Sequence, residues 1–506
     1  MFTRRRLLQG LGALAVSSAF PPAARAESYP FALGIASGYP SPDGITLWTQ
    51  ISASQAPVRV KWEVATDDSM RSVVRSGEQI ASPEWAHSVH VDVQGLQPDR
   101  WYSYRFTAQG AQSAVGRTRT APAARAPVER LRFAFASCQQ YEQGFYGAYR
   151  HIAADQPDFV AFLGDYIYES SWGKDHVRSH GSLEPYSLED YRARYALYRS
   201  DPDLQAAHAA CPWLAIWDDH EVDNDYAGDR PEDATARTEF LQRRAAAYRA
   251  YYEHMPLPER MRPKGPELRL HTHIGWGSLA RIYMLDTRQY RSQQACPRPN
   301  RRGGSNTVDI EKCARLGAPG RSMLGRAQER WLEGALGDSQ AGWNVLAQTT
   351  RMAQFDQRPG PGRRAWTDAW DGYPEARRRL CKAFAEKNVA NPVVIGGDIH
   401  AFMVAQLKEN FDDPESPSVA SEFIGTSITS QGWPQERVAK LLPDNPHVLL
   451  NDSRHRGYTR VEVTPQRWLA DLRIVDTVKT RDAACSTLAS YVVESGRPGP
   501  IKASGT

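Results

Sequence analysis

Side chains that can bind metal ions or phosphate follow five apolar segments of the sequence, each at the point where the segment ends. The five groups are, in chain order, Ser137-Cys138, Gly164-Asp165-Tyr166-Ile167-Tyr168, residues 218–225, Asp286-Thr287-Arg288 and Gly397-Asp398-Ile399-His400. The segments in front of them have the apolar character of buried strands. In open α/β sheets, ligands bind beyond the carboxyl ends of the strands. We therefore expect several carboxylates, two histidines and a thiol to converge on one place.

Such a convergence of acids predicts bound cations. Carboxylates that meet without counter-charge raise one another's pKa, so the cluster is stable only when cations occupy it. Oxygen atoms of Asp and Asn suit hard ions such as calcium. A thiolate, a phenolate and an imidazole together suit a transition metal such as iron or zinc. The residue types thus predict a mixed site for two or three metal ions.

Each group taken alone also has a purely structural explanation. An Asp at a strand end, such as Asp165 or Asp286, often caps a following helix. A lone cysteine after a strand, such as Cys138, usually packs as a small hydrophobic residue. Residues 218–225 could form a solvated loop. Their joint occurrence at successive strand ends is what favours a metal centre.

The chain from about residue 130 onward alternates between strand and helix patterns. Strands are expected at 131–136, 159–163, 213–217, 281–285, 343–347 and 392–395, and helices at 146–154, 188–210, 234–254, 326–335 and 374–387. Apolar strands separated by amphipathic helices are typical of a layered α/β domain with mixed sheets. We place this domain at residues 126–482 and treat residues 483–506 as a C-terminal extension.

Residues 27–125 instead read as an all-β domain. Apolar alternation occurs at 45–48, 58–64 and 89–93, with turn signals between these segments. A turn followed by alternating aromatic residues at 96–105 resembles the fibronectin type III pattern. An Ala/Pro-rich linker at 121–127 follows. We expect a small β-sandwich in front of the α/β domain.

The first 26 residues have the features of an export signal. Arg4-Arg5-Arg6 precede a weakly apolar run, and Ala24-Arg25-Ala26 offers small residues for cleavage. Paired arginines in this position resemble a twin-arginine signal, which implies export of the folded protein by the twin-arginine translocase to the periplasm or the exterior. An ordinary secretory signal with a basic start is the alternative. The apolar run is too short to span a bilayer, and no later segment is expected to do so.

Composition excludes several classes of protein. The mean hydropathy of −0.56 does not fit a protein with many membrane spans. The net charge of +4 is carried by the export signal, which has four arginines and no acid, so the rest of the chain is neutral. Nothing in that balance indicates a nucleic-acid partner.

The six cysteines fit an oxidising compartment. Cys296 and Cys313 flank a segment rich in Pro, Arg, Gly and Asn, and a disulfide that closes this loop is the simplest interpretation. Cys211, Cys381 and Cys485 have no obvious local partner.

The motifs resemble those of calcineurin-like metallophosphatases, and most closely those of the alkaline phosphatase D (PhoD) family. This family carries Ser-Cys-Gln, Gly-Asp-x-x-Tyr, Trp-Asp-Asp-His-Glu-Val-x-Asn, Asp-Thr-Arg-Gln-Tyr-Arg and Gly-Asp-x-His. The matching segments here are 137–139, 164–168, 217–224, 286–291 and 397–400. The resemblance extends over nearly the whole chain, including the β-sandwich and the leader.

The resemblance implies a ferric ion and one or more calcium ions. In the family's pattern, iron binds at the positions of Cys138, Asp165, Tyr168 and His400. Calcium binds at those of Asp165, Asn224 and Asp398. The wider superfamily would instead place its amide ligand at Asp219, so both Asp219 and Asn224 remain candidates.

The implied activity is hydrolysis of phosphate monoesters and diesters by hydroxide that iron and calcium activate. His220 could protonate the leaving group, or it could orient a ligand. Two arginines are predicted to bind phosphate: Arg288, which follows a strand directly, and Arg194, which shares a helix face with three tyrosines. The aromatic segment 368–373 could wall the pocket or could pack as a turn on the core.

Two other functions remain open at this point. Relatives with the same motifs cleave phospholipids, so hydrolysis of lipid headgroups, as by phospholipase D, is a second enzymatic possibility. A non-catalytic binding protein with calcium as a structural element is a possibility of another class. A structural calcium site, however, has no need of Cys138 or Tyr168 as ligands.

Overall fold

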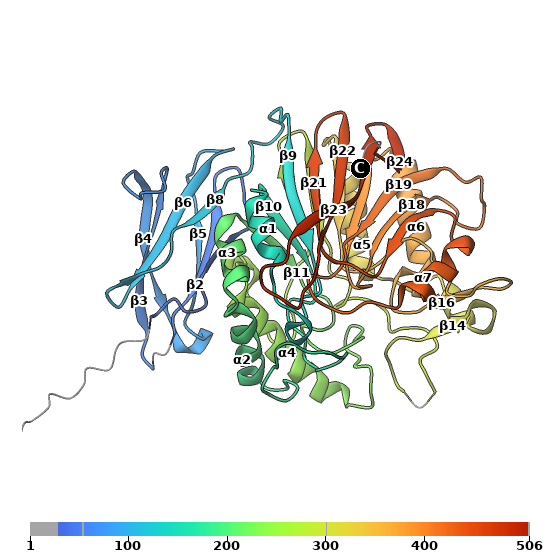
Figure 1. Ribbon diagram of the computed structural model, residues 1–506, viewed down its shortest axis with the longest axis horizontal. Coiled ribbons are helices and arrows are strands. Elements are labelled where there is room, and N and C mark those ends of the chain that lie inside the picture. The colour runs from blue at the N-terminus through green and yellow to red at the C-terminus, as the bar shows by residue number, and fades with distance from the viewer. Residues whose placement is uncertain (1–28, 53–54, 300, 504–506) are drawn as a thin grey trace, which may run out of the picture.

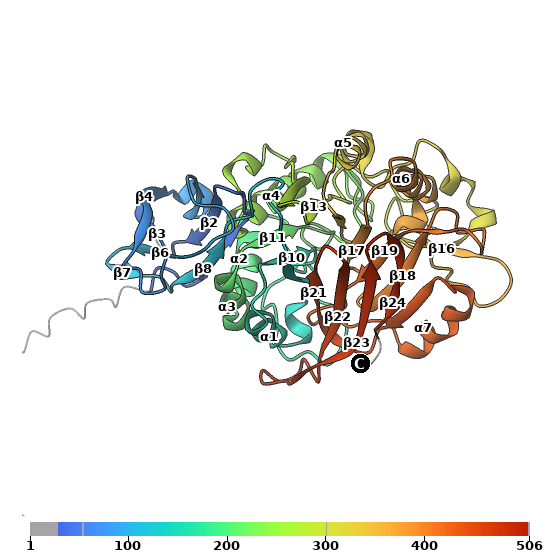
Figure 2. The same ribbon diagram turned by 90° about the horizontal axis from the view of Figure 1, so that it is seen from above.

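A computed structural model describes residues 29–52, 55–299 and 301–503. The predicted export signal at 1–26 lies outside these residues. Three sheets of five or more strands form the framework of the described chain, and the two largest face each other across a shared apolar core (Figures 1 and 2). The predicted fold class, a β-sandwich followed by a layered α/β domain with mixed sheets, is confirmed.

The largest sheet has ten strands and joins segments from the whole length of the chain. Its order is β24 (Arg497–Lys502), β23 (Cys485–Glu494), β22 (Arg467–Val475), β21 (Arg456–Val463), β9 (Leu131–Ala136), β10 (Phe159–Leu163), β11 (Trp213–Ile216), β1 (Ile35–Gly38), β2 (Ile45–Gln50) and β5 (Ser88–Val93). The central strands β9, β10 and β11 are parallel, and Arg132 is their only polar residue. The described part of the segment 483–506, which was expected as a C-terminal extension, contributes the last two strands of this sheet, β23 and β24.

The second sheet has seven strands. Its order is β12 (Thr272–Trp276), β13 (Ala280–Met284), β15 (Trp343–Ala347), β17 (Pro392–Gly396), β19 (Ser418–Ile424), β18 (Phe402–Lys408) and β20 (Val448–Asp452). The run β13-β15-β17-β19 is parallel. A two-stranded ribbon of β14 (Thr307–Asp309) and β16 (Arg364–Trp366) stands apart from it.

Helices cover the outer faces of the two large sheets. They are α1 (Ala148–Ala154), α2 (Leu188–Arg199), α3 (Pro202–Ala210), α4 (Arg237–His254), α5 (Gly325–Gly337), α6 (Pro374–Glu386) and α7 (Gln435–Leu441). In Figure 2, α5 and α6 lie on the side of the seven-stranded sheet that faces away from β21–β23. Phe133, Phe159 and Val345 pack between the sheets, whereas Leu332 and Phe384 pack between the seven-stranded sheet and its helices.

The N-terminal sandwich shares one of its layers with the ten-stranded sheet. Its outer sheet contains β4 (Val73–Ala81), β3 (Val58–Ala65), β6 (Trp101–Ala108), β7 (Ala111–Gln112) and β8 (Gly116–Arg119). The facing layer is β1-β2-β5, and β1 also pairs with β11 through Gly38 and Trp213. The sandwich expected at residues 27–125 is therefore continuous with the α/β domain through the backbone pairing of one sheet.

The helix expected at 188–210 is two helices. Helix α2 ends at Arg199, and α3 begins at Pro202. Proline has no backbone N–H and favours the first turn of a helix. The Asp201 side chain caps α3 by accepting hydrogen bonds from the backbone N–H groups of Asp203 and Leu204. Among the described residues, no helix is both long and apolar enough to cross a membrane.

Candidate metal centre

The carboxyl ends of the parallel strands of both large sheets meet at one place. Residues Ser137, Gly164 and Asp218 follow the strands β9, β10 and β11 of one sheet, and Gly397 follows β17 of the other. A Cβ atom at Gly397 would lie only 2.3 Å from Ser137 Oγ. The glycine therefore allows the two sheets to approach each other where the predicted ligands begin.

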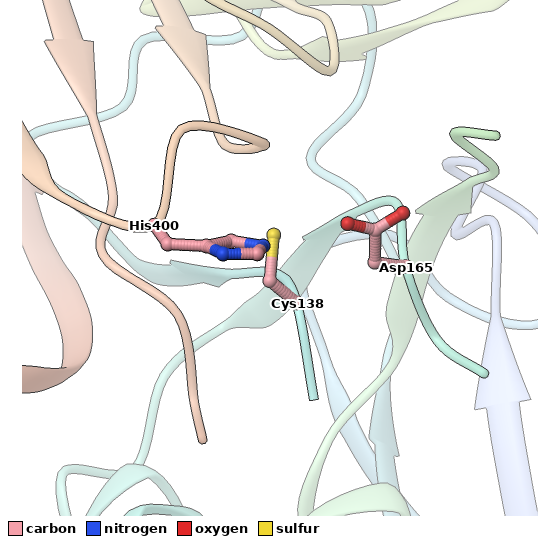
Figure 3. Close-up of side chains that lie close together, drawn as sticks. All are labelled: Cys138, Asp165 and His400. Atoms are coloured by element: carbon pink, nitrogen blue, oxygen red, sulfur yellow. The ribbon is translucent and has the colours of Figure 1, made fainter. Parts of the chain in front are cut away.

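Four predicted ligands come together in a single cluster, which we call the metal-site donors: Cys138, Asp165, Tyr168 and His400. Ligand atoms of Cys138, Asp165 and His400 all lie within 4.8 Å of one another. Figure 3 shows these three side chains close together. The Tyr168 hydroxyl donates a hydrogen bond of 3.0 Å to Asp165 Oδ2 and lies 3.1 Å from His400 Nε2. Sulfur, phenol, carboxylate and imidazole groups thus face a common point.

Unusual backbone conformations position these side chains. Cys138, Asp165, Asp398 and His400 have φ angles of 59°, 58°, 66° and 52°, in the left-handed region that side chains other than glycine rarely adopt. Strain of this kind persists where the surrounding structure fixes it, and it concentrates at functional sites. In front of Asp165, Gly164 has a φ of 94° and its Cα packs against Asp218. These backbone conformations direct the side chains toward the site, although they are energetically unfavourable.

Asp165 also belongs to a second group. Its carboxylate, Asp219 and His220 have ligand atoms within 4.8 Å of one another, and Asp219 forms a third group with Asp225 and Asp368. Asp368 already pairs with two arginines: Arg291 binds its Oδ1, and Nη2 of Arg288 lies 2.9 Å from its Oδ2. Among the described residues, no lysine or arginine forms an ion pair with Asp165, which belongs to the first two groups.

The charges of the metal-site donors fit a bound cation. Asp165 Oδ1 is buried without a hydrogen-bond partner. Burial, and then the neighbouring Asp219, raise the pKa of Asp165 well above its usual range, although His220 lowers it. Burial and the Asp165 charge raise the pKa of Cys138 and of Tyr168. Without a cation these groups cannot all be ionised, and with one they offer the donor set of a transition metal.

The imidazole of His400 is prepared to act as a ligand through Nε2. Its Nδ1 lies 2.8 Å from the Gln431 carbonyl oxygen, which can only accept a hydrogen bond, so Nδ1 carries the proton. Burial, and then Arg456, lower the pKa of His400 to about 3, so the ring is neutral. A backbone partner of this kind fixes ring orientation in metal-binding histidines.

A cavity of about 570 Å³ opens beside the cluster. Asp219, Asn224, Asp398 and His400 line it, together with further acidic and aromatic side chains. The amide nitrogen of Asn224 donates to Glu232, which leaves the amide oxygen available as a ligand. Asp398 accepts a hydrogen bond from the Thr350 hydroxyl. The oxygen-rich wall suits a hard cation.

His220 lines the same cavity and is held by Glu169, a residue that the motifs did not single out. Its Nδ1 lies 2.7 Å from Glu169 Oε2, and its ring lies 4.2 Å from that of Tyr168. Although burial opposes it, the charges of Glu169, Asp219 and Asp165 raise the pKa of His220 well above its usual value. Burial also raises the pKa of Glu169, but His220 lowers it to about 2.

The two arginines predicted to bind phosphate lie behind the cavity, not in its wall. Arg194 does turn inward from α2, but its guanidinium donates to the carbonyl oxygens of Tyr168, Glu169 and Leu183. Arg288 is fully buried between Asp218 and Asp368. The prediction of direct phosphate contact therefore does not match their positions, because neither side chain lines the cavity. Backbone carbonyl groups bind Arg194, and Asp218 and Asp368 bind Arg288.

Arg351, which the sequence interpretation passed over, does line the cavity. It follows β15 by four residues, after Gln348-Thr349-Thr350. Its signal was the same strand-end position that identified the other groups, applied to the strand at 343–347. The segment 368–373 supports the wall from behind: Asp371 Oδ2 lies 2.8 Å from Arg351 Nη2.

Comparisons with known proteins agree with this geometry. The family model described as "PhoD-like phosphatase" matches residues 133–472, and that of the "PhoD-like phosphatase, N-terminal domain" matches residues 15–122. Alkaline phosphatase D of Bacillus subtilis (strain 168) is 44% identical over 534 residues, covering 100% of this chain and 90% of that protein.

Solved structures give the same result. The structure of PhoD has a TM-score of 0.89 and 43% identity, covering 95% of this chain and 93% of that one. A purple acid phosphatase of yellow lupin has a TM-score of 0.58 at 10% identity and covers 92% of this chain and 74% of its own. The second likeness concerns the fold alone.

Proposed function

Because the chain belongs to the PhoD-like phosphatase family and is a phosphoric ester hydrolase, we propose that it hydrolyses phosphate monoesters and diesters in the cavity beside the metal-site donors. The observation that carries this proposal is the meeting of Cys138, Asp165 and His400 within 4.8 Å, with the Tyr168 hydroxyl bonded to Asp165. Relatives of the metallophosphatase type imply metal ions, and this donor set is chemically suited to them.

We assign the metals by the hardness of the donors. Ferric iron would bind to Cys138, Asp165, Tyr168 and His400, since an anionic thiolate and phenolate stabilise a trivalent ion against reduction. Calcium would bind to oxygen atoms of Asp165, Asn224 and Asp398, with Asp219 as the further candidate. The unpartnered Oδ1 of Asp165 supports a carboxylate shared between the two ions.

Bound metal ions would supply an activated water and offset the negative charge that develops on the phosphoryl oxygens. The chain's own contribution is a proton donor and its support. His220 faces the cavity and can protonate the leaving oxygen. Glu169 fixes the ring through Nδ1 and favours its charged form, while Arg194 holds the backbone of Tyr168 and Glu169. A donor that keeps its proton above neutral pH suits an alkaline phosphatase.

Elemental analysis of the freshly purified protein tests the metal assignment. We expect about one iron and at least one calcium per chain, by analogy with sites of this donor set. Cys138→Ala should lose both iron and activity. The matched control is Cys381→Ala, since Cys381 is equally buried but lies in α6, in the separate core between the seven-stranded sheet and its helices. Full iron and activity in Cys138→Ala would refute the assignment.

Three substrates separate the possible activities: 4-nitrophenyl phosphate, bis(4-nitrophenyl) phosphate and phosphatidylcholine. We expect release of nitrophenol from the first two. Faster release of choline from phosphatidylcholine than of nitrophenol would assign the protein to phospholipase D-type chemistry instead. Membership in a phosphatase family argues against a non-catalytic protein with a structural calcium site.

We also propose that the protein acts outside the cytoplasm after twin-arginine export. The leader at 1–26 lies outside the described residues, so this proposal rests on its sequence and on the disulfide. Cys296 and Cys313 form the expected bond, with a sulfur–sulfur distance of 1.99 Å, as an oxidising compartment favours. Replacing Arg5 and Arg6 by lysine should leave the protein in the cytoplasm, and unchanged export would point to an ordinary secretory signal.

A further inference from the structure

The wall of the cavity is dominated by carboxylates, and Arg351 is the one lysine or arginine side chain among its described lining residues. A phosphate ester carries one or two negative charges on its non-bridging oxygens, so it must enter a negatively charged space. Cations bound at the proposed metal site would offset part of this charge. Arg351 offers the remaining fixed positive charge on the substrate's side.

The surroundings of Arg351 orient its guanidinium while leaving one end of it unused. The residue is only 3% exposed. Its Nη2 binds Asp371 Oδ2 at 2.8 Å, its Nε donates to the Ala353 carbonyl oxygen at 3.2 Å, and the group lies 4.9 Å over the ring of Phe355. Its Nη1 makes no hydrogen bond within the described chain, yet it is not among the fully buried polar atoms without a partner. That nitrogen is therefore accessible from the cavity.

The residue that precedes Arg351 contacts a predicted metal ligand. The preceding residue, Thr350, donates its hydroxyl proton to Asp398, one of the predicted calcium ligands. Asp398 in turn precedes His400 by two residues. Arg351 thus follows β15, the strand that pairs with β17 in front of Asp398 and His400, and this places it beside the metal site.

A second arginine provides a built-in comparison. Arg377 is 5% exposed, binds the other oxygen of Asp371 at 2.6 Å and lies 4.9 Å over the ring of Phe411. It differs from Arg351 in two respects. It does not line the cavity, and its two terminal nitrogens donate further hydrogen bonds to Met352 and Gln354. Burial and pairing with Asp371 are thus common to both, whereas the accessible nitrogen belongs to Arg351.

We propose that Arg351 is a substrate-binding residue that donates a charge-assisted hydrogen bond from Nη1 to a non-bridging phosphoryl oxygen. Asp371 is the positioning residue that holds the guanidinium in place. This inference rests on the proposed phosphoesterase function and names the residue that recognises its anionic substrate. It replaces Arg194 and Arg288 in that role, since both are bound to the protein behind the cavity.

The test compares Arg351→Met and Arg351→Lys with Arg377→Met and Arg377→Lys. The quantities measured are kcat/KM for 4-nitrophenyl phosphate, the inhibition constant of inorganic phosphate, and iron content. A hydrogen bond to a charged group is worth about 10- to 100-fold in affinity. Arg351→Met should therefore weaken phosphate inhibition and kcat/KM by about that factor at unchanged iron content, and Arg351→Lys by about 10-fold.

The Arg377 variants should keep the inhibition constant of phosphate within about twofold of the wild type, even where they lower stability. Wild-type phosphate inhibition in both Arg351 variants at full iron content would overturn the proposal. So would equal effects of the matched Arg351 and Arg377 variants on phosphate inhibition. Should Arg351→Met fail to fold, the lysine variant carries the test, since it keeps the positive charge beside Asp371.

Calorimetric titration with inorganic phosphate separates this proposal from the general function. If the wild type binds phosphate through Arg351 but cleaves neither nitrophenyl ester, the phosphoesterase function fails and the role of Arg351 stands. If the wild type cleaves both esters and Arg351→Lys binds phosphate as tightly as the wild type does, the function stands and the role of Arg351 fails.

Discussion

Two buried aspartates, Asp368 after β16 and Asp165 after β10, carry their charge in opposite ways. Asp368 is fully buried, and Arg288 and Arg291 pair with its two oxygens. Asp165 is equally buried, but Oδ1 has no partner, and no arginine or lysine pairs with it among the described residues. Burial raises the pKa of both, yet the arginines bring that of Asp368 down to about 2, whereas that of Asp165 stays well above its usual range.

The difference distinguishes carboxylates that arginines of the chain neutralise from carboxylates that need a bound cation. The pairs around Asp368 complete the charge balance within the chain, so this region is a structural support for the strand ends. The metal-site donors are left with an imbalance that hydrogen bonds from Tyr168 and Ser430 do not remove. A protein with no use for a cation would gain stability by removing such a group. Retaining it implies a function that requires the charge.

Of the variants proposed here, Asp165→Asn should change iron content and activity most, and it tests the difference between Asp165 and Asp368 directly. The variant loses a ligand that both ions would share, so we expect loss of iron and a fall in activity of about 1,000-fold or more. In the presence of a chelator, the same variant should melt at a higher temperature than the wild type, because a repelled buried carboxyl becomes neutral. The measurements are elemental analysis, nitrophenyl phosphate hydrolysis and thermal unfolding with chelator.

A chelated Asp165→Asn protein that melts below the chelated wild type would contradict this interpretation. It would mean that Asp165 stabilises the fold by contacts of its own rather than through a cation. Retention of iron would mean that Asp165 is not a ligand.

Asp368→Asn should instead lower the melting temperature in the same experiment with chelator. Its removal leaves Arg288 and Arg291 buried without their shared partner, and breaking a buried pair in this way costs about 3–5 kcal/mol. The loss should be similar with and without chelator, since it concerns pairing within the chain. Urea unfolding measures it, and a loss that appears only in the metal-loaded protein would instead place Asp368 among the metal ligands.

The sequence allowed the backbone of this site to be predicted better than its basic side chains. Strands 131–136, 159–163 and 343–347 match the structure, because short apolar runs between helix patterns have few alternatives. Cys138, Asp165, Tyr168 and His400 converge because the parallel strands β9, β10 and β17 of the two sheets end at the same place. The prediction of one helix over 188–210 was wrong, because Pro202 begins a second helix within that segment.

The roles of the arginines could not be read from local sequence. Arg288 follows a strand end as predicted, but its partner Asp218 lies 70 residues away in the sequence, and only the tertiary structure brings them together. Arg194 turns inward as its helical spacing indicated, but the carbonyl groups that it binds belong to a loop whose path the sequence does not fix. A position at a strand end identifies an arginine that could bind substrate. Its hydrogen-bond and ion-pair partners within the protein then determine whether the guanidinium is available to the substrate.

Glu169→Gln tests whether a paired acid next to the metal-site donors serves chemistry rather than support. His220→Asn should lower kcat by about 100-fold or more, as for loss of a general acid. Glu169→Gln leaves His220 in place but removes the charge that orients it, so we expect a smaller loss of about 10-fold in kcat with little change in KM. Glu184→Gln is the matched control, since Glu184 also lines the cavity but pairs with Arg243. Equal losses in the two glutamine variants would show that Glu169 has no specific role.

His90 illustrates a third way to bury a titratable group, namely without any charge, and its expected effect is the smallest. The ring stacks on Tyr252 at 4.2 Å, its Nδ1 donates to the Leu257 carbonyl oxygen, and burial lowers its pKa to about 4. An unfolded histidine has a pKa of about 6.5. Between these two values the unfolded chain binds a proton that the folded chain does not. This histidine therefore lowers the free energy of unfolding as the pH falls from about 6.5 toward 4, by about 2 kcal/mol at pH 5.

His90→Phe keeps the ring and removes the titration. At pH 7.5 the variant should be less stable than the wild type by about 1 kcal/mol, because the hydrogen bond to Leu257 is lost. At pH 5 that deficit should shrink by about 2 kcal/mol and change sign. Urea unfolding of both proteins at the two pH values, with chelator present to exclude metal release, measures the change. A constant deficit would show that His90 is protonated in the folded protein, and the contrast between neutral burial here and cation-dependent burial at Asp165 would then fail.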